Sequence, residues 1–331
     1  MQIVWRKYNN FLLYGRTKKA KIFKIKIIFG KYFNYVRKNA YICPDILNFS
    51  AGSLLLIITI VGLNKDNDMK IALIGYGKMG HIIEEIAKSR GHEVVCAIDI
   101  QNQEDFDSEA FRTADVAIEF TTPKTCLGNV RKCLERGVTV VVGSTGWYNE
   151  LPKVEQDVKE ANGSLFWASN FSLGVNIFVA MQKYVARIMN NYPQYDVTLS
   201  ETHHIHKLDS PSGTAITIAG AITGNLDRKQ TWKETAAIWQ HEDGSVDVDR
   251  NAEVGTAFSS HSDDELEVVA FRRGEVPGIH TVTYDSDVDT ITMTHSAKSR
   301  RGFALGAVVA AEWMSDGKKG VFTMEDMMRF N

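Results

Sequence analysis

The residues between 201 and 215 carry the densest chemistry in the sequence, reading Glu-Thr-His-His-Ile-His-Lys-Leu-Asp-Ser-Pro-Ser-Gly-Thr-Ala. Three imidazoles and one ammonium group fall within five residues, those of His203, His204, His206 and Lys207. Repulsion among neighbouring cations is expected to lower the pKa values in such a cluster, which favours proton transfer near neutral pH. The stretch is therefore a candidate for acid/base chemistry.

Two other interpretations of this cluster stay open. A metal ion could be held through His204 and His206, although the stretch offers no nearby third ligand and has Lys207 beside them. The imidazoles could also be purely structural.

A candidate anion site follows the cluster. Pro211 and the turn formed by Ser212, Gly213 and Thr214 precede an expected helix over residues 215–226. Backbone N–H groups at a helix N-terminus, together with two hydroxyls, suit a carboxylate. An N-cap alone would explain Ser212, but not the cations before it. Cations, a proton donor and an anion site in one loop fit the reduction of a small dicarboxylate.

A glycine-rich turn near residue 75 indicates a dinucleotide site. It follows an apolar run at 70–74 and precedes a helical pattern, and a second apolar run ends in an acid 19 residues after its last glycine. A lone turn of this kind is weak evidence, but the flanking strand, helix and acid agree with the dinucleotide-binding spacing. Phosphate would bind at the helix N-terminus, and the acid would accept from ribose hydroxyls. The candidate residues are Gly75, Tyr76, Gly77, Lys78, Met79, Gly80 and Asp99.

Strands and helices continue to alternate after this turn. Strands are expected at 116–120, 138–142 and 165–168, and helices at 123–136 and 150–161. The alternation predicts a doubly wound, parallel sheet, in which ligands bind at the carboxyl ends of the strands. Ordinary helix N-caps would also explain the small polar loops found there. Two such loops contain Gly143, Ser144 and Thr145, and Ala168, Ser169, Asn170 and Phe171.

A second domain is expected after residue 171, because the regular strand and helix units stop there. After a helix at 175–190, strands are expected at 195–201, 236–241, 253–259, 265–272, 279–285 and 287–295. Their close spacing implies an antiparallel or mixed sheet. A last helix at 303–315 is rich in small residues and is expected to pack back on the first domain.

The predicted protein is of the α/β class. A Rossmann-like dinucleotide-binding domain spans 69–171, with 302–331 packed on it, and an α+β domain for substrate binding and oligomerisation spans 172–301. The 331 residues suffice for two domains of roughly 150 residues. Hydrophobic residues at 44% and charged residues at 24% exclude a wholly disordered, collagenous or many-spanning membrane protein. Four cysteines without a CxxC pair predict a reducing, cytoplasmic location.

Residues 1–68 differ sharply from the rest in composition. Residues 1–44 hold eight Lys and three Arg with no acid, a net charge of +11, whereas 69–331 carries 26 basic and 37 acidic residues, a net charge of −11. The apolar stretch at 54–63 is ten residues long, which is short of the roughly 20 that span a bilayer. We interpret residues 1–68 as lying upstream of the true start at Met69 and outside the fold. A targeting or anchor segment and a nucleic-acid-binding arm are the alternatives.

The stretch from 201 to 215 resembles that of the 4-hydroxy-tetrahydrodipicolinate reductases, also called dihydrodipicolinate reductases, of lysine biosynthesis. The resemblance rests on Glu-x-His-x-x-x-Lys-x-Asp-x-Pro-Ser-Gly-Thr-Ala and extends over 69–331. The turn at 75–80, Gly-Ser-Thr-Gly at 143–146 and Ala-Ser-Asn-Phe-Ser-Leu-Gly-Val-Asn at 168–176 support it.

The resemblance implies NAD(P)H-dependent reduction of the cyclic product of pyruvate and aspartate semialdehyde to tetrahydrodipicolinate, in a homotetramer built through the second domain's sheet. It implies that His203 is the general acid/base and Lys207 the proton donor. Substrate contacts are implied for His204, Ser212, Gly213 and Thr214, and the loops at 143–145 and 168–171 would hold the nicotinamide end. The expected partners are a small dicarboxylate and further copies of the chain, with no nucleic acid, membrane or metal.

Some features depart from the family pattern or bear on the cofactor. The stretch between Asp99 and Asp115 is short, Lys78 stands where arginine is common, and residues 1–68 have no counterpart. No nearby cation follows Asp99 in the sequence to accept a 2′-phosphate, and the carboxylate would repel one. NADH is therefore expected to serve at least as well as NADPH.

Two other classes of protein remain as alternative functions for this sequence. A redox-sensing regulator would need a helix-turn-helix domain, and residues 1–68 contain no pair of capped amphipathic helices. A different two-domain amino-acid dehydrogenase is the stronger alternative, and it would reduce an oxo acid with ammonia.

The charge step at Met69 leads to a first prediction. A chain of residues 69–331 is expected to fold and to turn over substrate like the full-length chain, because the first strand begins one residue after Met69. Circular dichroism and steady-state rates of both chains check this. An insoluble or inactive shorter chain beside an active full-length chain would contradict it.

Overall fold

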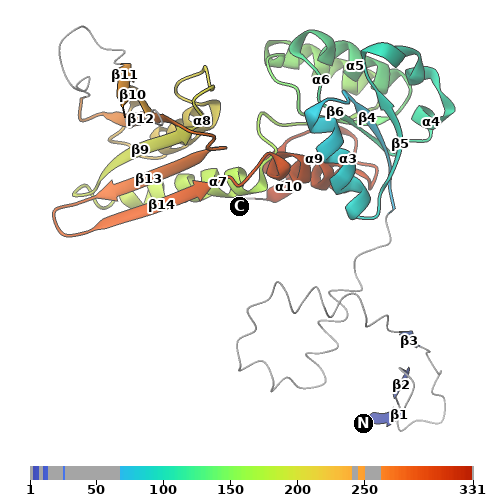
Figure 1. Cartoon of the computed structure of the whole chain (residues 1–331), viewed down its shortest axis with the longest axis horizontal. Coiled ribbons are helices and arrows are strands. Elements are labelled where there is room, and N and C mark those ends of the chain that lie inside the picture. The colour runs from blue at the N-terminus through green and yellow to red at the C-terminus, as the bar shows by residue number, and fades with distance from the viewer. Residues whose placement is uncertain are drawn as a thin grey trace. The chain divides into compact units, whose positions relative to one another are not determined.

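The computed structural model describes residues 68–240, 245–249 and 262–329, together with three short strands before them (Figure 1). The chain divides into two compact units, Met1–Asp66 and Asn67–Asn331. Strands β1 (Ile3–Arg6), β2 (Asn10–Leu13) and β3 (Ile25–Lys26) form an antiparallel sheet in the first unit. The apolar stretch at 54–63 and the strand expected at 253–259 lie outside the described residues. In the part that is described, we find no helix with the length and apolar character needed to cross a membrane.

The first sheet of the second unit is entirely parallel. Its strands are β4 (Lys70–Ile74), β5 (Glu93–Ile98), β6 (Val116–Glu119), β7 (Thr139–Val142), β8 (Ser164–Trp167) and β15 (Gly320–Phe322). Their order is β15-β8-β7-β6-β4-β5. The sequence predicted the five strands before residue 171 as a parallel, doubly wound set. Strand β15 was not predicted, and it extends the sheet beside β8.

Helices cover both faces of this sheet (Figure 1). They are α3 (Lys78–Ser89), α4 (Glu109–Arg112), α5 (Pro123–Glu135), α6 (Leu151–Glu160), α9 (Arg301–Met314) and α10 (Met324–Met328), with 3₁₀ helices η2 (Ile100–Asp107) and η3 (Tyr148–Glu150). Because side chains alternate along a strand, Ile71 and Leu73 pack in one core with α3 and α9, while Ala72 and Ile74 pack in the other with α5 and α6.

Helix α9 approaches the first sheet very closely. A Cβ atom built on its Gly306 would lie 1.7 Å from the carbonyl oxygen of Phe171, so this contact requires glycine. The small residues Ala304 and Ala307 are fully buried in the same core. The helix therefore sits directly over the loop that leaves β8.

The second sheet is mixed. It contains β9 (Asp196–His203), β10 (Thr231–Gln240), β11 (Val246–Asp249), β12 (Glu265–Arg273), β13 (Ile279–Asp285) and β14 (Thr290–Ser296), in the order β11-β10-β12-β9-β13-β14. Strands β10, β12 and β9 run parallel to one another, and the other neighbouring pairs are antiparallel. Helices α7 (Leu173–Met189) and α8 (Gly213–Thr223) pack on one face through a third core.

The sequence placed some boundaries wrongly in this region. Strand β10 begins at Thr231, five residues before the predicted start, and β11 was not predicted. Strand β14 begins at Thr290 rather than at residue 287, because a turn closed by hydrogen bonds between Ser286 and Asp289 occupies the intervening residues. Between β5 and β6 the structure has the helices η2 and α4, which were not predicted. The side chain of Asp99 caps η2, and that of Ser108 caps α4.

Candidate active site

Nine of the residues selected from the sequence line one cavity of about 860 Å³. Residues from the part with the parallel sheet and from the part with the mixed sheet line it. From the loops after β7 and β8 come Thr145, Ser169 and Asn170, and from the segment between β9 and α8 come His203, His204, Lys207, Ser212, Gly213 and Thr214. Each of these segments follows the carboxyl end of a strand, which is where open α/β sheets bind ligands.

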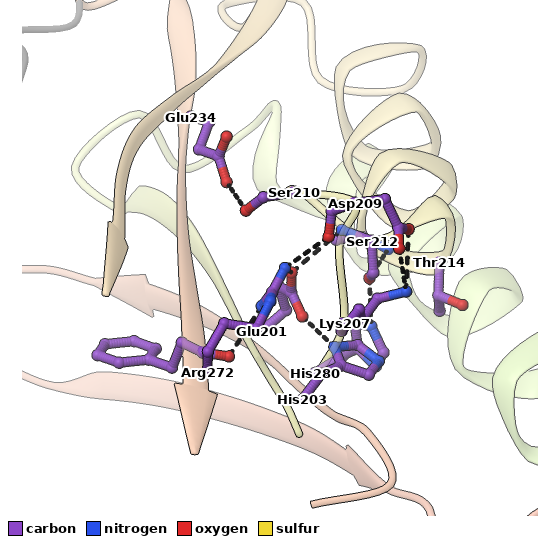
Figure 2. Close-up of polar contacts among 12 residues, drawn as sticks. Glu201, His203, Lys207, Asp209, Ser210, Ser212, Thr214, Glu234, Arg272 and His280 are labelled. Atoms are coloured by element: carbon purple, nitrogen blue, oxygen red, sulfur yellow. Dashed lines mark hydrogen bonds and ion pairs between the residues drawn. The ribbon is translucent and has the colours of Figure 1, made fainter. Parts of the chain in front are cut away.

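His203 is the last residue of β9 and shares a face with Glu201. Because residues two apart point to the same side of a strand, both side chains are buried on the face that packs against α8. The Glu201 carboxylate accepts a hydrogen bond from His203 Nδ1 and another, at 3.1 Å, from Arg272 Nη2 (Figure 2). Burial acts to raise the pKa of Glu201, but the hydrogen bond and charge of His203 and the Arg272 charge outweigh it and hold the pKa low.

Lys207 is paired rather than free. Its Nζ donates to both carboxylate oxygens of Asp209, at 2.7 and 2.9 Å (Figure 2). Both residues line the cavity. Burial acts to raise the pKa of Asp209, and the Lys207 hydrogen bond and charge reverse this to a net lowering. Next along the loop, exposed His206 contacts Glu275 at 3.2 Å.

These pairings correct the electrostatic expectation drawn from the sequence. The pKa of His204 is lowered, but the largest cause is burial, and repulsion from His203 is smaller. Each of the other cationic side chains in the cluster has an acidic neighbour: Glu201 for His203, Glu275 for His206 and Asp209 for Lys207. The loop therefore pairs most of its basic side chains with acids, and repulsion among them is only a smaller cause of the lowered pKa of His204.

The start of α8 is the candidate anion site. Ser212 is the N-cap: its Oγ accepts from Ala215 N at 3.1 Å, and its own N–H donates to Glu201 Oε1 at 3.1 Å. Ser212 is buried and caps the helix, and it also lines the cavity, so its contact with substrate stays a prediction. Gly213 and Thr214 are the first two residues of the helix, whose N–H groups have no partner within a helix and are available to a carboxylate.

Asn170 joins the two halves of the site. Its Nδ2 donates to Thr214 Oγ1 at 3.1 Å, and its Oδ1 accepts from Ser172 N at 2.8 Å. The Asn170 carbonyl also accepts from Asn176 Nδ2 at 2.9 Å. The loop after β8 is thus hydrogen-bonded directly to the anion site.

The glycine turn has the geometry that a dinucleotide requires. Gly75 has φ of +91°, and a Cβ there would lie 2.2 Å from Phe120 O. A Cβ on Gly80 would lie 2.5 Å from Gly75 O, which shows how closely α3 packs on the turn. A Cβ on Gly77 would meet nothing within 4 Å, so the backbone at the start of α3 is open to a phosphate group. The turn therefore fits a pyrophosphate.

The remaining residues of the turn have distinct positions. Asp99 Oδ2 accepts from Tyr76 N at 3.3 Å, which places the acid directly beside the turn. The Tyr76 ring packs edge-on against His81 and its hydroxyl donates to Glu84, so this tyrosine faces α3. Met79 lines a smaller cavity of about 220 Å³ together with Gly143, Ser169, Asn170 and Phe171. This smaller cavity connects the turn to the predicted nicotinamide loops.

Several of the loop residues have side chains that are buried or engaged within the protein. Ser144 is buried, and its hydroxyl accepts from Thr121 N at 2.8 Å. A Cβ on Gly143 would lie 2.1 Å from the Phe120 ring, so the loop packs tightly there. The side chains of Ala168 and Phe171 are buried in the core under α9. Of the seven loop candidates, the side chains of Thr145, Ser169 and Asn170 are the ones left to line the larger cavity.

Sequence reasoning missed three buried polar residues at the site. Arg272 is the penultimate residue of β12, His280 lies on β13, and Glu201 belonged to the quoted motif but received no role. Burial lowers the pKa of His280 to about 4, and its ring centroid lies 5.2 Å from that of His203. The spacing of Glu201 and His203 on one strand face was a usable signal. Arg272 and His280 are far away in sequence and gave none.

The proposed metal pair does not come together as a site. The rings of His204 and His206 lie 6.2 Å apart by their centroids, and His206 turns toward Glu275. Within the described ranges, donor atoms of Glu201, His203 and His280 lie within 4.8 Å of one another. The Arg272 guanidinium already contacts Glu201, so a second cation would be repelled there.

A parallel nucleotide-type sheet, joined to a mixed-sheet domain through a cavity with acid/base and anion-holding groups, defines a two-domain Rossmann oxidoreductase. Residues 69–171 match the N-terminal model of dihydrodipicolinate reductase, and residues 174–328 match its C-terminal model. The chain belongs to the dihydrodipicolinate reductase family.

Individual relatives agree with this assignment. The 4-hydroxy-tetrahydrodipicolinate reductase of Christiangramia forsetii is 42% identical over 262 residues, covering 78% of this chain and 98% of that protein. The one from Methanopyrus kandleri is 35% identical over 218 residues, covering 66% of this chain and 72% of that protein. A solved structure of dipicolinate-bound dihydrodipicolinate reductase from Paenisporosarcina sp. TG-14 shares the fold, with a TM-score of 0.59 at 21% identity, covering 78% of this chain and 99% of that one.

Proposed function

We propose that the chain catalyses the NAD(P)H-dependent reduction of 4-hydroxy-tetrahydrodipicolinate to tetrahydrodipicolinate, in diaminopimelate and lysine biosynthesis. One observation carries the proposal: His203, Lys207 and the N-terminus of α8 line the same cavity as the loop after β8. Family membership supports it, and it disfavours both the amino-acid dehydrogenase and the regulator weighed from the sequence. Neither of those needs this combination of groups.

The cofactor would bind along the first sheet. The open backbone at Gly77 and the N-terminus of α3 would hold the pyrophosphate, Asp99 would accept from the adenosine ribose, and the loops after β7 and β8 would flank the nicotinamide. When bound, the reduced dinucleotide supplies a hydride. The Asn170 link to Thr214 keeps the nicotinamide loop beside the anion site.

The second domain would bind the substrate and supply the proton for its reduction. The N–H groups of Gly213 and Thr214 would hold one ring carboxylate of the substrate, with His204 at the same wall. The 4-hydroxyl group of the substrate would leave as water, which gives a conjugated, electron-poor ring. Addition of a hydride to this ring leaves negative charge that a proton has to neutralise. Lys207 would deliver that proton near the ring nitrogen, with Asp209 orienting its ammonium, and His203 would act as the acid/base partner.

Substitution of these two residues tests the proposal. His203→Ala and Lys207→Ala should each lower kcat by about 10²–10⁴-fold, the usual effect of removing a positioned proton-transfer group. The NADH dissociation constant should hardly change, because the turn at 75–80 is untouched. His206→Ala is the matched control, since this exposed imidazole of the same loop does not line the cavity, and it should stay within about threefold of wild type. Wild-type kcat in both His203 and Lys207 variants would refute the mechanism.

We further propose that NADH is used at least as well as NADPH. Asp99 would meet a 2′-phosphate with a negative charge, and the Asn102 side chain that follows is turned back toward Asp99 N and Ala97 O. The ratio of kcat/KM for the two cofactors, with substrate generated in place by the preceding synthase, measures this. Asp99→Asn should move the ratio toward NADPH. A preference for NADPH above about tenfold in the wild type, some 1.4 kcal/mol, would contradict the proposal.

The assembly we propose is a homotetramer formed through the second sheet, in the reducing cytoplasm. Within the described ranges, α7 and α8 cover one face of this sheet, while Val269 and Phe271 lie half-buried on the opposite face. The described cysteines are free, which fits a reducing compartment. Sedimentation should give a tetramer, and Phe271→Glu should dissociate it. A monomeric wild-type chain would exclude this assembly.

A further inference from the structure

We propose that Glu201 is a positioning residue, which fixes the tautomer and orientation of His203 and ties it to the anion site. The inference deepens the proposed function and rests on it. Figure 2 shows the arrangement: the Glu201 carboxylate lies at the centre, with His203, Arg272 and Ser212 around it.

Glu201 is a buried carboxylate with three donors. Its side chain has no exposed surface, and it accepts from His203 Nδ1, from Arg272 Nη2 at 3.1 Å and from Ser212 N at 3.1 Å. A buried charge is tolerated only when it is paired and hydrogen-bonded, and here both conditions are met. The pKa of Glu201 is held low, so the group is an ionised acceptor.

An ionised carboxylate can accept hydrogen bonds but cannot donate them. The contact therefore requires that His203 carries its hydrogen on Nδ1, which leaves Nε2 as the atom that exchanges a proton with substrate. The position of Gly278 agrees with this assignment, because a Cβ there would lie 2.9 Å from His203 Nε2. The absent side chain keeps that edge of the ring unobstructed.

Arg272 extends the control of Glu201 to the lysine loop. It has no exposed surface, and its Nη2 donates to the carbonyl of Asp209 at 2.7 Å as well as to Glu201. Asp209 in turn holds Lys207. One carboxylate thus fixes the acid/base imidazole directly, the anion site through Ser212 N, and the proton-donating lysine through Arg272.

Glu201→Gln is the decisive substitution, because it keeps the shape and removes the charge. The amide can present N–H to Nδ1, which selects the Nε2–H tautomer and places the wrong atom toward substrate. Replacing a carboxylate that orients a catalytic histidine by its amide costs about 10⁴-fold in serine proteases. For full-length protein we expect kcat to fall about 10²-fold or more, with the NADH dissociation constant unchanged within about threefold.

Two further variants separate positioning from folding. Glu201→Asp keeps the charge and should restore kcat to within about tenfold of wild type, which a purely packing role would not predict because aspartate leaves a gap. The double variant Glu201→Gln with Arg272→Gln removes both charges and avoids an unpaired buried guanidinium. It should have the low kcat of the single Gln variant when corrected for folded protein.

A spectroscopic readout makes the test independent of turnover. The ¹⁵N resonances of the His203 ring, assigned by their loss in His203→Asn and recorded where the imidazole is neutral, should show hydrogen on Nδ1 in wild type. Hydrogen on Nε2 in wild type, or a folded Gln variant within about threefold of wild-type kcat, would overturn the inference. If His203→Ala lowers kcat and Glu201→Gln does not, the inference alone fails. If wild type does not reduce the substrate, the proposed function fails.

Discussion

A negative charge shut away from water has to be neutralised and hydrogen-bonded, and this requirement at Glu201 organises the second domain. Strand β9, which carries this carboxylate, lies between the parallel strand β12 and the antiparallel strand β13. The parallel register with β12 aligns Arg272 with His203, and the antiparallel register with β13 aligns His280 with Glu201. The mixed character of the sheet is therefore what brings a cation and a neutral imidazole to the two sides of one acid. The loop that returns to α8 completes the set of donors with Ser212 N.

The first domain depends on close backbone approach instead of buried charge. Gly75, Gly80 and Gly306 each stand where a Cβ would lie within 2.5 Å of a backbone oxygen. These contacts pack α3 against the turn and α9 against the loop that leaves β8. The carboxyl ends of β7 and β8 can then face the cavity with loops held firmly from behind, while Gly77 leaves its backbone open. Rigid support on one side and open backbone on the other suit a phosphate-bearing ligand.

Local patterns carried most of what could be predicted. The turn at 75–80 and the stretch at 201–215 are contiguous, so their strands and helices were readable from spacing, and the roles of their residues stay predictions. Arg272 and His280 were not readable, because 71 and 79 residues separate them from Glu201 and only strand register brings them together. The expected lowering of a pKa in the histidine cluster is found at His204, where repulsion from His203, His206 and Lys207 contributes. Burial is the larger cause, and neither burial nor the opposing charge of Glu275, which lies outside the motif, could be read from the stretch itself.

The hydrogen bond from Asn170 to Thr214 joins a loop of the cofactor domain to the anion site of the substrate domain. A ligand that orders either partner of this bond lowers the conformational entropy that the other ligand must still overcome. Cofactor and substrate would then bind with positive cooperativity, and thermodynamic linkage requires that each strengthen the other by the same factor. Once one of the two products has left, the enzyme would therefore release the other more readily.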